Sequence, residues 1–341
     1  MHYHYRGKVY LLLFLFVLFL LGNSVVLGKK NKPDSVRLLP EKYDVWSADW
    51  SQDGRIVFSG KNEGDEGNKM RIWLYRLQLD ASPVAWTGTG ALIDASPRWA
   101  PDGSGVVMVR KRASNFSAQD MNTEIWWKAF PSGEGLQLTL GPEDRDPVCS
   151  PDGKRVLFVR GEGLYSSSLL TVNLNDRKIK TFFSNEQGFI STPEWGVGDK
   201  IYYTLMKPKK KLVKTDTQSY ECWGLDKGSI WMYDPETGVK TAIIDDEYDN
   251  RHPAVSPKGS YLAYVSTKGE NGPENKIFRD RGSLYLLDLK TGDRFQITSG
   301  VSLNGAPPRW SPDGKELAFS SFRENRPAMW RIDWKKHAVK E

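Results

Sequence analysis

The chain has 341 residues, of which 26% are charged and 39% are hydrophobic, and its formal net charge is +6. Residues 1–28 contain Arg6 and Lys8 and no acidic residue, so the remainder carries +4, which is too little to predict a nucleic-acid partner. The two cysteines, Cys149 and Cys222, cannot form a disulfide framework, although an oxidising compartment would allow one bond between them.

Residues 1–28 have the features of a targeting segment. Arg6 and Lys8 precede a continuous apolar run at 10–21, and small residues follow up to Gly28. This predicts a signal peptide cleaved near Gly28. The alternative is an uncleaved membrane anchor, which would place Asn23 and Ser24 in the bilayer. Either interpretation predicts a folded part outside the cytoplasm, periplasmic or secreted, after a linker at 29–34.

One short module recurs along the rest of the chain. Its clearest copy, residues 308–315, reads Pro-Arg-Trp-Ser-Pro-Asp-Gly-Lys. Good copies lie at 97–103, 147–153 and 253–259, and degraded copies lie at 48–54 and 193–199. Successive copies are 49, 50, 46, 60 and 55 residues apart. A period near fifty residues is typical of a repeat architecture.

The module predicts the same local structure in every repeat. Pro-Asp-Gly between two apolar runs is typical of a tight turn, which here joins a short strand carrying Trp to a longer strand. Two more strands follow, so each repeat supplies four. Six four-stranded antiparallel units around an axis form a β-propeller. We therefore predict an all-β, six-bladed propeller over residues 35–341.

The two ends of the propeller predict how its ring closes. Residues 36–39 form a strand with no earlier strand to pair with, whereas the sixth repeat lacks its outer strand. We expect the N-terminal strand to complete the last blade, which leaves no open sheet edge. Trp50, Trp99, Trp195 and Trp310 share one position of the module and should pack between blades.

Two insertions follow the second strands of the fourth and fifth repeats. They span residues 207–227 and 268–281, and we expect both on one rim of the disc. The basic run at 207–211 is typical of a solvated loop, and Cys222 falls in the same loop. We place these insertions on the face opposite the mouth of the channel described below.

The module and the strands that follow it resemble the TolB-type β-propeller repeat. Pro-Arg-Trp-Ser-Pro-Asp-Gly-Lys precedes Leu-Ala-Phe at 317–319, and the fifth repeat adds Leu-Tyr-Leu-Leu-Asp at 284–288. The resemblance covers residues 35–333. It implies an exported protein that binds protein partners of the cell envelope. TolB proteins also have an α/β domain before the propeller, for which residues 29–34 leave no room.

Motifs of common enzyme classes are missing from this sequence. It contains no Gly-x-Ser-x-Gly nucleophile elbow, no His-Glu-x-x-His zinc motif and no phosphate-binding loop. We therefore name no catalytic residue and expect a monomeric, non-enzymatic scaffold that binds a protein at the cell envelope. The alternative is a propeller enzyme of the lyase or glycosidase type, which would use paired carboxylates at the channel mouth.

Polar side chains recur just before or within the first residues of the innermost strands. Because these loops converge on one end of the channel, they define our candidate ligand or partner face. Its residues are Asp44, Asp94, Asp144, Asp249, Asn250, His252 and Asn304. Such a ring of oxygen atoms could hold Ca²⁺, and no other cofactor is expected. The alternative role for these side chains is to cap turns and strand ends.

Overall fold

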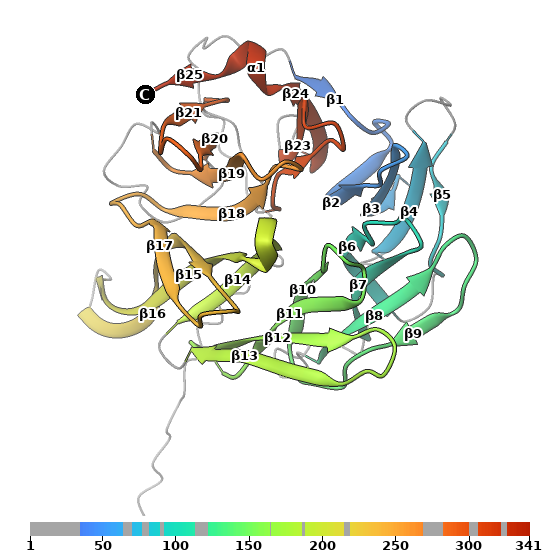
Figure 1. The fold of residues 1–341 in the computed structure, drawn as a ribbon, viewed down its shortest axis with the longest axis horizontal. Coiled ribbons are helices and arrows are strands. Elements are labelled where there is room, and N and C mark those ends of the chain that lie inside the picture. The colour runs from blue at the N-terminus through green and yellow to red at the C-terminus, as the bar shows by residue number, and fades with distance from the viewer. Residues whose placement is uncertain are drawn as a thin grey trace, which may run out of the picture.

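Six antiparallel sheets surround a central axis in the computed structural model, so the predicted propeller is confirmed (Figure 1). The structure describes residues 35–63, 70–76, 82–88, 92–112, 122–163, 165–185, 188–214, 219–268, 282–299, 306–321 and 326–341. In the first five blades the strand that comes first in the chain lies innermost and the next three follow outward, whereas in the sixth blade the N-terminal strand lies outermost. The six sheets therefore follow from the fifty-residue period of the sequence.

The strands of the first three blades have regular four-strand order. They are β2 (Tyr43–Trp50), β3 (Arg55–Asn62), β4 (Arg71–Arg76) and β5 (Val84–Ala85); β6 (Leu92–Trp99), β7 (Gly105–Arg112), β8 (Thr123–Ala129) and β9 (Gly135–Gln137); and β10 (Asp144–Cys149), β11 (Arg155–Gly161), β12 (Ser167–Asn173) and β13 (Ile179–Asn185).

The last three blades depart from that regularity. Their strands are β14 (Phe189–Trp195), β15 (Ile201–Lys214), β16 (Ser219–Tyr233) and β17 (Lys240–Ile244); β18 (Asn250–Val255), β19 (Tyr261–Ser266), β20 (Ser283–Asp288) and β21 (Arg294–Gln296); and β22 (Arg309–Trp310), β23 (Glu316–Ser321) and β24 (Ala328–Asp333). The sixth blade is completed by β1 (Val36–Arg37).

Pro-Asp-Gly turns join the two inner strands of a blade, as the sequence predicts. Gly103, Gly153 and Gly314 have φ of 70°, 67° and 70°, a left-handed conformation that favours glycine. Asp313 Oδ1 accepts hydrogen bonds from Ser311 Oγ at 2.7 Å and from the Lys315 amide at 3.0 Å. The turns define one face of the disc, which we call the turn face. The loops leading into the innermost strands define the opposite loop face.

The fourth blade replaces this turn with the short helix η2 (Val197–Asp199). Its module lacks Pro-Asp-Gly, and Gly198 has φ of 70° inside the helix. The η2 helix is the yellow-green coil near the centre of Figure 1. A cavity of about 790 Å³ borders it, lined among others by Trp195, Val197 and Pro257. The degraded sequence of this module therefore has a visible structural consequence.

The N-terminal strand closes the ring as predicted. Val36 pairs with Arg331 and Arg37 pairs with Trp330, so β1 lies antiparallel to β24. The Leu38 amide then donates to the Met329 carbonyl at 2.9 Å. Leu38 and Leu39 are buried in a cluster with side chains of the first blade. These contacts join the two ends of the chain in one sheet.

The C-terminal segment continues beyond the point where the sequence pattern ends. Helix α1 (Trp334–His337) follows β24, and β25 (Val339–Lys340) adds a fifth strand to the fifth blade by pairing with β21. Trp334 is buried there and its indole donates to the Gly314 carbonyl at 3.0 Å. The chain therefore ties the sixth blade to the fifth as well as to the first.

The insertion of the fourth blade is a pair of strands, so the predicted solvated loop at 207–227 is wrong. Strands β15 and β16 stay paired from Pro208 opposite Leu225 to Lys214 opposite Ser219. Cys222 accordingly lies in β16 and not in a loop. Lysine-rich composition suggested a loop, but charged side chains are compatible with a strand pair in which opposite charges face each other.

This strand pair also projects from the loop face, whereas we expected the opposite face. Phe189 opens β14 on the loop face and pairs with Met206, and Met206 in turn pairs with Gly228. Because β15 runs antiparallel to β14, it returns to the face where β14 began. The insertion at 268–281 lies outside the described residues except for Lys268.

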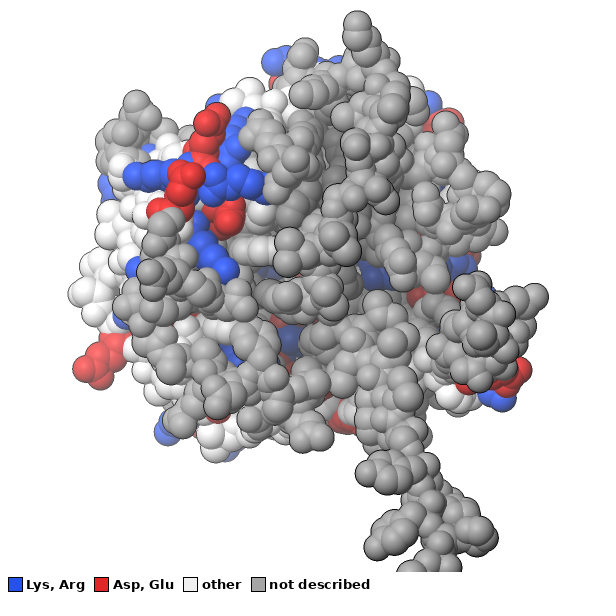
Figure 2. Space-filling view, turned by 180° about the vertical axis from the view of Figure 1, so that it is seen from behind, with Lys and Arg blue, Asp and Glu red and all other residues white. Residues whose placement is uncertain are grey.

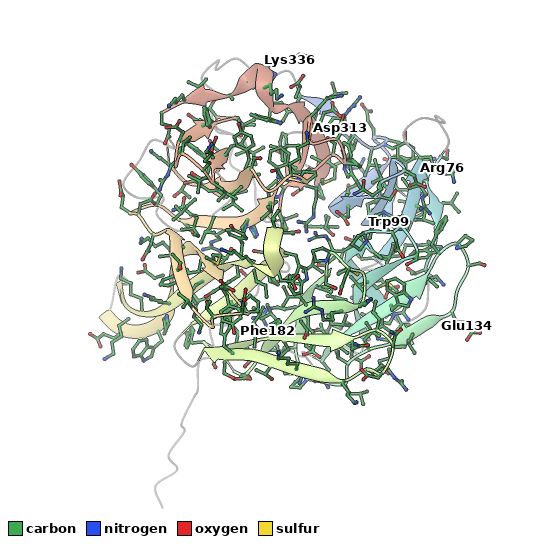
Figure 3. All side chains as sticks on the ribbon, viewed as in Figure 1. Arg76, Trp99, Glu134, Phe182, Asp313 and Lys336 are labelled. Carbon is green, nitrogen blue, oxygen red and sulfur yellow. The ribbon has the colours of Figure 1, made fainter. Side chains whose placement is uncertain are left out.

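Apolar side chains fill the spaces between neighbouring blades. Val107 and Ile125 of the second blade pack with Val156 and Phe158 of the third. Trp99 and Trp195 are buried in such clusters, which confirms the expected packing role. Figure 3 shows Trp99 toward the interior, whereas Glu134 and Lys336 lie at the periphery. Cys149 is a buried, free thiol.

Candidate functional site

A bulge at one position of the innermost strands shapes the channel. The register shifts in β6, β10, β14 and β18. At each shift a residue with positive φ precedes proline: Ser96 (50°), Asp146 (54°), Thr192 (48°) and His252 (61°). Non-glycine residues rarely adopt this conformation, and bulges re-aim the side chains that follow. Proline suits the bulge because it has no N–H to place in the ladder.

Four charged side chains of innermost strands meet in the centre of the ring. They come from four blades: Asp49 from β2, Arg98 from β6, Glu194 from β14 and Arg309 from β22. Arg98 donates two parallel hydrogen bonds of 3.0 Å to the Glu194 carboxylate. Its Nε lies 3.4 Å from Asp49. We call these four residues the channel network.

Arg309 completes the channel network from the sixth blade. Its Nη1 lies 3.4 Å from Glu194 Oε2 and its Nε lies 3.7 Å from Asp49 Oδ1. Asp49 also accepts the Trp99 amide at 2.8 Å. The four side chains are only 12–14% exposed. Two arginines thus neutralise two carboxylates in a largely desolvated space.

Burial sets the electrostatics of this space. It opposes the charge on Arg98, but Glu194 and Asp49 outweigh it and hold the pKa of Arg98 above its usual range. Burial, followed by the charge of Arg98, lowers the pKa of Arg309 to about 10. Both arginines remain charged at neutral pH. Burial also lowers the pKa of His252 to about 3, helped by Arg251 and Arg309, so that imidazole is neutral.

Three of the predicted mouth residues are buried carboxylates that bind arginines. Asp94 accepts from Arg110 at 2.7 and 3.0 Å, and Asp144 accepts from Arg160 at 2.7 and 2.9 Å. In each of these two pairs, the aspartate and the arginine lie opposite each other on the first two strands of the blade. The same arginine–carboxylate pairing therefore occurs in two repeats, and in each the arginine neutralises the charge of the carboxylate.

In the fifth blade the arginine that pairs with the carboxylate is only two residues away along the chain. Asp249 accepts from Arg251 at 2.6 and 2.7 Å and from the Gly228 amide at 2.7 Å. Asn250 is buried beside it and donates to Asp246 Oδ1 at 2.7 Å. The His252 amide donates to Thr204 Oγ1 at 3.0 Å.

Asp44 and Asn304 differ from the other predicted residues. Asp44 is 32% exposed and accepts from Arg326 of the sixth blade at 2.7 Å. Asn304 lies outside the described residues. Figure 2, which shows the side opposite to that in Figure 1, has acidic and basic side chains lying beside one another. Within the described part of the chain, no three His, Cys, Asp or Glu side chains are placed to hold a metal ion.

The channel network was missed at the level of sequence, although the module contains a signal for it. The residue between Pro and Trp is Arg98, Glu194 or Arg309 in three copies, and Asp49 takes the same place in the first. Because alternate side chains of a strand point to opposite sides, a residue next to the packed Trp points away from it. A charged residue there predicts a polar channel.

Comparisons with known proteins agree with this architecture. No family model matches the chain. An uncharacterized protein of Agrobacterium fabrum, Atu1656, is 24% identical over 193 residues, which covers 54% of this chain and 53% of that protein. The Tol-Pal system protein TolB of Alcanivorax borkumensis is 33% identical over 84 residues, which is 25% of this chain and 17% of that protein. The chain thus spans about half or less of these relatives.

Solved structures extend the likeness to nearly the whole chain. TolB from Acinetobacter baumannii superposes with a TM-score of 0.62 at 18% identity, covering 84% of this chain and 63% of that one. An oligogalacturonate lyase in complex with manganese has a TM-score of 0.55 at 15% identity, covering 89% and 79%. The fold is therefore a six-bladed propeller, and its channel is lined by charged side chains that form ion pairs with one another. More particularly, the chain is a TolB-like six-bladed β-propeller.

Proposed function

We propose that this protein is a monomeric, non-enzymatic scaffold that binds a protein partner at the cell envelope through its loop face. The observation that carries the proposal is the pairing of carboxylates in and around the channel. Asp94, Asp144 and Asp249 each accept two hydrogen bonds from an arginine, and Glu194 does the same in the centre. Glycoside chemistry needs two carboxyl groups that are accessible to a sugar.

Arginine-bound carboxylates support a structural role for the channel. A carboxylate that accepts a bidentate arginine has both of its oxygens engaged, and withdrawing that arginine leaves a buried, uncompensated charge. Partner binding is then assigned to surface residues, because binding residues commonly lie on loops that a rigid scaffold holds in position. The likeness to TolB supports an envelope partner and a periplasmic location. In the part of the chain that the structure describes, no helix has the length and apolarity needed to cross a bilayer.

The test compares two matched surface variants as baits for envelope proteins. Lys42→Glu with Glu247→Lys exchanges exposed charges of the loop face, and Lys154→Glu with Glu236→Lys exchanges exposed charges of the turn face, both without changing the net charge. We expect the wild type and the turn-face variant to retain the same envelope protein and the loop-face variant to lose it. Equal retention by both variants would contradict the choice of face.

The enzymatic alternative is tested on the same preparations. Oligogalacturonides and other acidic oligosaccharides are incubated with the wild type and with Glu194→Gln, and shortened or unsaturated products are measured. We expect no product above the level of the buffer. Turnover that disappears in Glu194→Gln would overturn the scaffold proposal.

A further inference from the structure

The paired ends of β15 and β16 extend beyond the sheet of the fourth blade. Strand β14 accompanies β15 only as far as Met206, and β17 accompanies β16 only from Ile230 onward. Seven register pairs, from Pro208 opposite Leu225 to Lys214 opposite Ser219, therefore have no third strand among the described residues. We call this extension the ribbon. Its β16 strand protrudes from the disc at the left of Figure 1.

A ribbon of two strands is marginally stable in water unless it packs against something else. The described contacts include one hydrogen bond that ties it to the neighbouring blade, from the Tyr165 hydroxyl to the Trp223 carbonyl at 2.7 Å. Lysines and a proline on such a strand discourage edge-to-edge aggregation, which accounts for Pro208, Lys209 and Lys210. It does not account for an exposed tryptophan.

Trp223 is that exposed tryptophan. All thirteen tryptophans of the chain are described; Trp223 is 55% exposed, and the other twelve are buried or partly buried. The Lys210 ammonium lies 5.6 Å from its ring centroid, and Glu221 lies 3.6 Å from the same lysine. The indole is thus presented to solvent on a strand whose backbone is held in place. Tryptophans in such positions supply much of the energy of protein interfaces.

Charge limits the kind of partner. Residues 207–227 contain six lysines and three acidic residues, which gives a net charge of +3. Both signs of charge occur in the described part of this segment, since the Lys209 ammonium lies 3.2 Å from Asp226 and the Lys210 ammonium lies 3.6 Å from Glu221. An anionic lipid surface would repel Glu221 and Asp226. A protein surface can match both signs while carrying the opposite net charge.

We propose that the ribbon is the binding surface for an acidic protein, with Trp223 entering an apolar pocket of that partner and the lysines contacting carboxylates around it. This inference rests on the proposed scaffold function and names the surface and the partner chemistry for it.

The test uses an aromatic photo-crosslinking amino acid, which keeps a large ring in place of the indole, at residue 223 and, as the control, at residue 239. Val239 belongs to the same blade and is also 55% exposed. Both proteins are irradiated with envelope proteins, with phosphatidylglycerol vesicles or alone. We expect a product with an acidic protein from residue 223 only, abolished by an excess of a peptide of alternating Glu and Leu.

The captured protein is then purified and its Kd is measured. We expect Trp223→Ser to weaken binding at least tenfold and Val239→Ser to leave it unchanged. Crosslinking to lipid or to a second copy of the chain, equal crosslinking at both positions, or a partner that is not acidic would overturn the inference. If surface baits retain a partner that never crosslinks at 223, only this inference fails. If no variant retains any envelope protein, the scaffold proposal fails with it.

Discussion

Arg98 of the second blade and Glu194 of the fourth are joined by two hydrogen bonds of 3.0 Å across the centre of the ring, although 96 residues separate them. Replacing Arg98 with Met would leave Glu194 with only its longer contact to Arg309, and Asp49 with the Trp99 amide and its longer contact to Arg309. We expect a loss of roughly 3–5 kcal/mol in the free energy of unfolding, because a buried charge loses its partner. Urea denaturation measures this loss.

The double variant Arg98→Met with Glu194→Met is the control for that experiment. It removes both partners and leaves Arg309 opposite Asp49, so we expect it to be more stable than Arg98→Met alone. A double variant that is as unstable as the sum of the two single variants would show that the two residues do not act as a pair.

Removal of β1 should open the ring. A protein lacking residues 1–42 loses the pairing with β24 and the buried side chains of Leu38 and Leu39, which are 2% and 4% exposed. We expect a markedly lower Tm and aggregation through the bare edge of β24. A protein lacking only residues 1–34 is the control and should have the same Tm as the full chain. Identical Tm values for the two shortened proteins would refute the role of β1.

The turn glycines can be tested without changing any packing. Gly314 has φ of 70°, and a Cβ there would meet nothing closer than Pro257 at 3.6 Å. Gly314→Val should therefore cost roughly 1–3 kcal/mol through backbone conformation alone. Gly88, which has open space around it and no left-handed conformation, supplies the control Gly88→Val. Equal stability of the two variants in urea would contradict the strain at Gly314.

His252 predicts a dependence of stability on pH. Its pKa falls from the usual 6.5 to about 3 in the folded state, so only the unfolded chain binds this proton between those values. Stability should then decline as pH falls from 6.5 toward 3, by about 1.4 kcal/mol per pH unit for one proton. His252→Asn, which tolerates the positive φ, should flatten this part of the profile. Parallel profiles for the variant and the wild type would count against a buried neutral imidazole.

The fold was predictable because its determinants are local. Pro-Asp-Gly sets the turn within a few residues, and the fifty-residue period repeats it, so the number of blades and the closing role of β1 followed from the sequence. The same locality explains the errors. The ribbon looked like a loop because lysine content says nothing about cross-strand partners, and β25 was missed because two residues, Val339 and Lys340, carry no pattern.

The candidate site was harder to predict because its contacts join distant repeats. The sequence located the acidic residues that lead into the innermost strands, but their pairing with Arg110 and Arg160 depends on strand register. The channel network depends on the ring itself: Glu194 lies 96 residues from Arg98 and 115 from Arg309. The spacing of residues within a single repeat cannot predict which side chains of different blades contact one another.

The closing strand has a consequence for the order in which the molecule forms. Val36 is among the first residues of the propeller to be synthesised, yet its partner Arg331 is made nearly 300 residues later. Blades one to five can assemble from neighbours in the chain, whereas β1 must wait for β24. We therefore expect nascent chains to carry an unsatisfied strand throughout translation, at a time when it is open to chaperones and proteases, and the ring to shut as the slowest step of folding.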